Sequence, residues 1–87
     1  MRENGISFRS EKVGFLTDFP TGGVGTVVDI DTETELQGRL MGMGLFVGAQ
    51  FRLLQGGNRS RQPLLLAIGD TRIALGCELG RCILVEQ

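Results

Sequence analysis

The side chains most able to do chemistry in this 87-residue sequence are two cysteines, Cys77 and Cys82. No histidine accompanies them, so the sequence lacks the commonest general base and the commonest metal ligand. A structural zinc site takes four ligands, which two thiols without histidine do not supply. We therefore expect no resident metal, no cofactor, and two reduced, at least partly buried thiols, because nothing in the sequence indicates the oxidising compartment that a disulfide needs.

Carboxylates gather on one short stretch that holds Asp29, Asp31, Glu33 and Glu35. One interpretation is an oxygen-rich cation site. The other is negative charge at the start of a helix, where it is favoured by the helix macrodipole and adds solubility. The spacing of an EF-hand loop is absent, so we favour the second interpretation.

No nucleophile in the sequence has a recognisable partner. Ser7, Ser10 and Ser60 lack a histidine that could act as base, and the glycine-containing run 41–45 lacks the Lys-Ser/Thr ending of a phosphate loop. We therefore predict a protein with no catalytic residues that is not an enzyme.

The overall composition indicates one small globular domain. Hydrophobic residues make up 41% of the chain, and the formal net charge is −1 with no basic block. The sequence therefore gives little support for nucleic-acid binding, and no apolar run approaches the ~20 residues that span a bilayer. The first ten residues lack the apolar stretch of a signal peptide, so we expect a cytoplasmic protein that does not insert directly into a membrane.

Fourteen glycines are spread along the chain, which is typical of short strands joined by tight turns. The strongest local signal is a two-residue turn at 69–70, which would place Ile68 opposite Thr71 and Leu66 opposite Ile73. With this hairpin, apolar patterning predicts strands over 24–30, 50–55, 64–68, 71–75 and 82–85.

One helix is predicted between the first two strands. Thr32 and Glu35 match a capping box, and Gly44 stands where a left-handed residue ends a helix. The apolar stripe along this helix is Leu36, Leu40 and Met43.

Five short strands are too few for a typical sandwich, and closing them into a small barrel removes exposed edges. The sequence thus predicts an all-β fold with a small helical content: a five-stranded barrel with one short helix, over residues 15–87. Residues 1–14 show no clean period and are predicted to form an N-terminal arm, either ordered or frayed.

Three pieces of the sequence, in order and with matching gaps, resemble one known family, ferrous-iron transport protein A (FeoA). The pieces are Leu16-Thr17-Asp18-Phe19-Pro20-Thr21-Gly22 with Gly25-Thr26-Val27, then Arg39-Leu40-Met41-Gly42-Met43-Gly44-Leu45 with Gly48, and finally Ile73-Ala74-Leu75 with Glu78 and Ile83-Leu84-Val85. The resemblance covers residues 15–86. The chain departs from the family pattern at Val47, where proline is usual, and at Gly76, Cys77 and Gly80 in the last turn.

The resemblance implies an SH3-like barrel and a cytosolic accessory protein of bacterial ferrous-iron uptake. It implies as partner the ferrous-iron permease, ferrous-iron transport protein B, which carries a cytosolic GTPase domain. The sequence does not decide whether the protein forms a homodimer, since exposed barrel edges or the arm could pair two copies.

The candidate partner-binding residues lie at the predicted helix end and in the loop that follows. Met41, Leu45 and Phe46 would supply adaptable apolar contacts, with Arg39 at the rim. The alternative is that Leu40, Met43 and Leu45 close the open end of the barrel, which would leave Met41 and Phe46 exposed.

Three other functions stay open. A nucleic-acid-binding barrel would need Arg52, Arg59, Arg61 and Arg72 to cluster near the hairpin loops. A direct iron carrier would have to rely on Cys77 and Cys82, and a metal-responsive interaction module is the third alternative.

Overall fold

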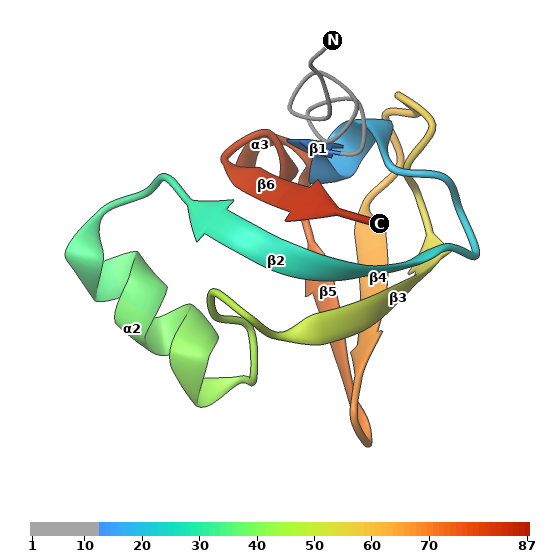
Figure 1. Cartoon of the computed structure of the whole chain (residues 1–87). Coiled ribbons are helices and arrows are strands. Elements are labelled where there is room, and N and C mark those ends of the chain that lie inside the picture. Colours follow the sequence, from blue (N-terminus) through green and yellow to red (C-terminus); the bar gives the residue numbers. More distant parts are fainter. Residues whose placement is uncertain (1–12) are drawn as a thin grey trace, which may run out of the picture.

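The computed structural model describes residues 13–87 and shows one antiparallel sheet with one helix beside it (Figure 1). The sheet order is β1-β6-β2-β3-β4-β5. In chain order the elements are β1 (Val13–Phe15), the 3-10 turn η1 (Leu16–Asp18), β2 (Val24–Ile30), α2 (Thr34–Gly42), β3 (Gln50–Gln55), β4 (Leu64–Ile68), β5 (Thr71–Leu75), the short helix α3 (Cys77–Gly80) and β6 (Ile83–Glu86).

The prediction of a mostly β protein with one short helix is confirmed, but the count of five strands is wrong. The sixth strand, β1, pairs with β6, with Val13 opposite Glu86 and Phe15 opposite Leu84. Among residues 13–87 the two end strands, β1 and β5, do not pair with each other, so the sheet is not closed. A three-residue strand is too short to leave a periodic pattern, and therefore no sequence signal marks β1.

β1 begins two residues inside the stretch that the sequence assigns to the N-terminal arm. Val13 and Gly14 belong to the sheet. The rest of the predicted arm, residues 1–12, lies outside the described residues.

A β-bulge in β2 changes which residues face the core. Val27 pairs with Val85 and Asp29 with Leu84, so Val28 is the extra residue. Strict alternation would place Val28 and Ile30 on the same face as Val24. In the structure, Val27 and Ile30 are buried, whereas Val24 is 52% exposed.

The β4–β5 hairpin forms in the predicted register. Ile68 pairs with Thr71 and Leu66 with Ile73. Gly69, at φ +59°, is the first of the two turn residues. This is the position where a type II′ turn requires a positive φ, which glycine adopts without strain.

Helix α2 departs from the sequence prediction at its first turn only. The N-cap is Glu33 and no side chain caps the first turn, so the capping box of Thr32 and Glu35 does not form. At the other end, Gly44 takes φ +100° and the Leu45 amide donates to the Leu40 carbonyl at 2.9 Å. This is the Schellman arrangement that the sequence predicts.

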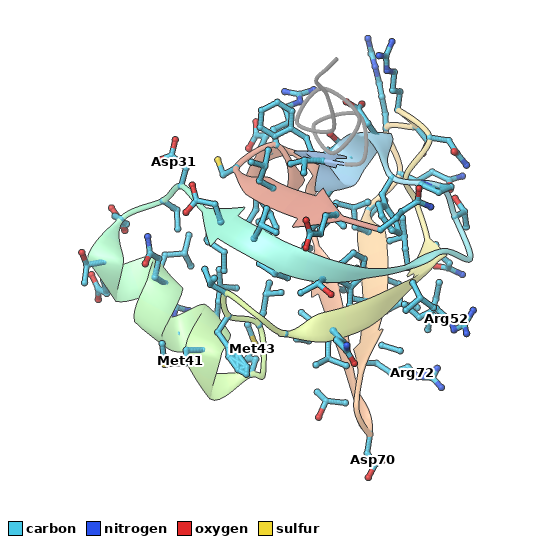
Figure 2. All side chains as sticks on the ribbon, in the orientation of Figure 1. Asp31, Met41, Met43, Arg52, Asp70 and Arg72 are labelled. Atoms are coloured by element: carbon cyan, nitrogen blue, oxygen red, sulfur yellow. The ribbon has the colours of Figure 1, made fainter. Side chains whose placement is uncertain are left out.

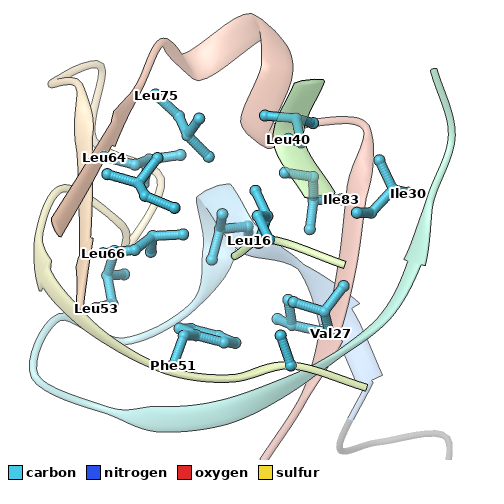
Figure 3. Packing of buried hydrophobic residues seen from close by; sticks show 14 of the residues in the cluster. Leu16, Val27, Ile30, Leu40, Phe51, Leu53, Leu64, Leu66, Leu75 and Ile83 are labelled. Atoms are coloured by element: carbon cyan, nitrogen blue, oxygen red, sulfur yellow. The ribbon is translucent and has the colours of Figure 1, made fainter. Parts of the chain in front are cut away.

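The core lies inside the curved sheet, with aliphatic side chains from every strand from β2 to β6 meeting Leu16 of η1 and Leu40 of α2 (Figure 3). Met43 is 45% exposed, so the prediction that it helps to close the barrel is wrong. The buried hydrophobic residues are Leu16, Phe19, Val27, Ile30, Leu40, Leu45, Ala49, Phe51, Leu53, Leu64, Leu66, Ile73, Leu75, Ile83 and Val85.

Candidate interaction surface at the end of helix α2

A shallow, mostly apolar depression lies between the end of α2, the loop after it and the end of β2. Its volume is about 250 Å³, and its exposed walls are Met41, Phe46 and Val47. We call these three residues the helix-end surface. The remaining lining residues are Ile30, Gln37 and Leu45.

The reversal of the chain at Gly44 creates this surface. The Schellman turn buries Leu45 against the end of the helix and directs residues 46–47 back beside Met41. The loop is then fixed to β2, because the Gly48 amide donates to the Val27 carbonyl at 2.8 Å.

Gln37 attaches the helix to the chain that precedes it. Its side-chain amide donates to the carbonyl of Ile30 at 2.9 Å and to the carbonyl of Thr32 at 2.8 Å. These bonds satisfy the carbonyl of the last residue of β2 and a carbonyl of the turn that follows, and they hold the wall of the depression in place.

The four residues that the sequence singled out occupy three different environments. Met41 is 61% exposed and Phe46 is 39% exposed, as expected for contact residues. Leu45 is completely buried and forms the floor beneath them. Arg39 is exposed on α2 but does not line the depression.

Val47 is the residue of this surface that sequence reasoning did not select. It is 61% exposed and lies beside Phe46 in the wall of the depression. The available signal was that the family usually has proline here, but nothing in the sequence said which way the side chain would point.

The carboxylates Asp29, Asp31, Glu33 and Glu35 are all exposed near the start of α2. Figure 2 shows Asp31 at one end of the helix and Met41 at the other. In residues 13–87 no group of three or more histidine, cysteine or carboxylate side chains is arranged to hold a metal ion.

The two thiols are not bonded to each other, and each is partly buried, as predicted. Cys77 donates from Sγ to the Gln62 carbonyl at 3.1 Å, and Cys82 donates from Sγ to the Glu78 carbonyl at 3.6 Å. The Cys77 thiol therefore contacts the β3–β4 loop, whereas the hydrogen bond of the Cys82 thiol stays within its own helical turn.

The four arginines proposed for nucleic-acid binding are divided between two places. Arg52 on β3 and Arg72 on β5 lie in one row of the sheet, on either side of Ala67 of β4 (Figure 2). Arg59 and Arg61 instead line a separate pocket next to η1. The predicted single cluster near the hairpin loops does not form.

Among the described residues, no helix combines the length and the apolar character that crossing a bilayer requires.

The sequence matches a family model described as the FeoA domain over residues 15–87. No curated protein sequence matches the chain. Nearly the whole of the described structure is thus covered by a single family model.

Solved structures give the same picture. A crystal structure of an iron uptake regulatory protein (FeoA) is similar with a TM-score of 0.74 and 28% identity, covering 85% of this chain and 96% of that one. A FeoA from Stenotrophomonas maltophilia is described as complexed with zinc and as a prokaryotic SH3 domain protein. It is similar with a TM-score of 0.70 and 25% identity, covering 84% of this chain and 89% of that one. An iron(II) transport protein A from Clostridium thermocellum gives 0.72 and 25%, covering 84% of this chain and 44% of that one. These similarities confirm the SH3-like fold.

Proposed function

The chain belongs to the FeoA family, and from this premise we propose that it is a cytosolic accessory protein that regulates ferrous-iron uptake by binding the cytosolic part of the ferrous-iron permease, ferrous-iron transport protein B. Membership of the family makes it a small protein associated with ferrous-iron transport. The family is one of accessory transport domains, so the proposal assigns the chain a binding role and no catalytic one.

The helix-end surface is the observation that carries the proposal. Met41, Phe46 and Val47 expose large apolar side chains side by side around one depression. Contiguous apolar exposure on a small protein often marks an interaction site, and methionine and phenylalanine are enriched where partners are held. We propose that an apolar side chain of the permease enters the depression, with Arg39 at the rim of the contact.

The proposal is tested by substituting the aromatic wall of the depression. Phe46→Ala is expected to weaken binding to the isolated cytosolic domain of the permease roughly tenfold, because the loss of a central aromatic contact costs an interface about 1.4 kcal/mol or more. Isothermal titration calorimetry measures the dissociation constant directly. Unchanged affinity of Phe46→Ala would remove this surface from the proposal.

Val24→Ala is the matched control. Val24 is also a largely exposed apolar residue, but it lies on β2 opposite Arg52, away from the helix-end surface. Its substitution is expected to leave the affinity unchanged. Equal weakening by both variants would indicate a general loss of apolar surface and would contradict a localised site.

A further inference from the structure

A second pocket lies on a different part of the molecule, where three segments distant in sequence converge. It has a volume of about 230 Å³ and is formed by η1, the loop between β3 and β4, and α3. None of its lining residues belongs to the helix-end surface. The lining residues are Thr17, Asp18, Arg59, Ser60, Arg61, Cys77 and Arg81.

Positive charge predominates in this pocket. Three arginines and one aspartate line it, which gives a local formal charge of +2 in a chain whose net charge is −1. Arg59 pairs with Asp18, with 3.3 Å between Nε and Oδ1. Within residues 13–87, no carboxylate forms an ion pair with Arg61 or Arg81. A concave site lined by one sign of charge concentrates ions of the opposite sign.

The loop that carries Arg59 and Arg61 is strained just before Ser60. Asn58 and Arg59 have φ of +52° and +62°, a left-handed conformation that residues with a Cβ rarely adopt. They stay there because the Asn58 amide donates to the Phe19 carbonyl and the Arg59 amide to the Thr17 carbonyl, both at 2.8 Å. Strain of this kind is concentrated at ligand-binding loops, where the fold holds a side chain in place before the ligand arrives.

Neutral donors complete the pocket. The Ser60 hydroxyl oxygen accepts from the Gln62 amide at 2.9 Å, which leaves the hydroxyl proton available to donate. The Cys77 thiol also faces this loop, with Sγ 3.7 Å from the Ser60 carbonyl and 3.1 Å from the Gln62 carbonyl. The loop and α3 are therefore linked at the pocket wall.

We propose that this pocket is a binding site for a phosphate group. Arg61 and Arg81 would donate charge-assisted hydrogen bonds to its oxygens, and Ser60 would donate a third. A water molecule occupies about 30 Å³ in the liquid, so the pocket has room for an anion several times larger than water. This proposal stands on the pocket alone and does not depend on the proposed binding of the permease.

The two thiols provide a test with an internal reference. Cys77 lines the pocket and Cys82 does not, so alkylation of each can be followed separately by peptide mass spectrometry in the same reduced, full-length protein. For each thiol, the alkylation rate with anionic iodoacetate is divided by the rate with neutral iodoacetamide. This ratio should be about fivefold higher at Cys77 than at Cys82, because the arginines of the pocket attract the anion. Inorganic phosphate at constant ionic strength should slow iodoacetamide at Cys77 and leave Cys82 unchanged.

Arginine substitutions assign the effect to the pocket. Arg61→Gln and Arg81→Gln should each reduce the iodoacetate preference at Cys77 and weaken protection by phosphate at least about threefold. Arg72→Gln, which removes an exposed arginine of β5, should change neither. All three side chains are exposed, so each variant should keep the circular dichroism of the parent.

Pyrophosphate and a phosphoserine peptide are titrated beside inorganic phosphate. Stronger protection by pyrophosphate assigns the site to free phosphates, and stronger protection by the peptide assigns it to a phosphorylated protein segment; either supports a phosphate site. Equal effects on both thiols, no protection by any of the three, or an effect of Arg72→Gln as large as that of Arg81→Gln would overturn the proposal.

Discussion

Leu45 and Phe46 are neighbours in the chain with opposite roles. Leu45 is completely buried under the end of α2, whereas Phe46 lines the depression above it. The division follows from the Schellman turn, whose characteristic apolar contact joins the residue after the left-handed glycine to the last turn of the helix. Leu45 thus supports the helix-end surface from beneath and has no exposed area to offer a partner.

This division predicts a large difference in stability between two apolar truncations. Leu45→Ala should lower the free energy of unfolding by about 2–5 kcal/mol, because it leaves a cavity in the core. Met41→Ala, at a mostly exposed position, should change it by no more than about 0.5 kcal/mol. Urea denaturation measures both, and equal effects would mean that Leu45 does not fill the core as described.

At the scale of elements, the loop between β3 and β4 depends on close contact with the segment after η1. Gly57, at φ +83°, is buried where an added Cβ would collide with the carbonyl oxygen of Phe19 and with Leu53. The next residue donates its amide to the same carbonyl. The loop therefore takes its shape from a backbone that only glycine allows to approach.

Two glycine substitutions should consequently change the stability of the protein in opposite directions. Gly57→Ala is expected to destabilise the protein by about 2 kcal/mol or more, from positive φ and from the collision. Gly38→Ala, in α2 with open space around its Cβ position, is expected to stabilise by about 0.5–1 kcal/mol. The midpoint of thermal unfolding shows whether each variant is more or less stable than the parent protein. A stabilising effect of Gly57→Ala would contradict the loop geometry.

At the scale of the whole molecule, the sheet of the described chain ends at β5. The Ile68–Thr71 pair flanks the two-residue turn, and narrow and wide pairs alternate from there along the hairpin. Ile73 and Leu75 therefore exchange backbone hydrogen bonds with β4, while the amides of Arg72 and Ala74 point away from it. β5 is thus one of the two end strands of the described sheet, and another strand could add to it.

Hydrogen exchange should follow this alternation. The amides of Ile73 and Leu75 are expected to exchange slowly, and those of Arg72 and Ala74 quickly, in NMR measurements on the protein alone. Slow exchange at all four would show that another segment or a second copy covers β5, which would contradict a free edge.

Much of the fold could be predicted from local patterns. The register of the hairpin at 69–70 and the end of α2 at Gly44 both follow from interactions within a few residues, and the structure has them as predicted. The capping box of Thr32 and Glu35 does not form because the helix begins one residue later, with Glu33 at the N-cap position.

The candidate site was less predictable. Met41 and Phe46 could be named because methionine and phenylalanine in a loop after a helix are typical contact residues. The sequence did not show that Leu45 is buried or that Val47 is exposed at the same surface. The direction of each side chain after the turn depends on which distant residues pack against it. For the arginine pocket, the sequence offered Arg59 and Arg61 only as members of a nucleic-acid surface with Arg52 and Arg72. It gave no signal that they meet Arg81, because the β3–β4 loop and the end of α3 come together only in the folded chain.

The sequence by itself determined the hairpin and the helix end, because turn sterics and hydrogen bonds between near neighbours act along a few residues of chain. It also determined the β character of the protein through its apolar patterning, and its family through three motifs in order. Only the tertiary structure decided the rest: the bulge at Val28, the sixth strand β1, the burial of Leu45 and the convergence of Cys77 with the arginines. Each of these depends on pairing or packing between segments far apart in the chain, and no local pattern records which distant partner a residue will meet.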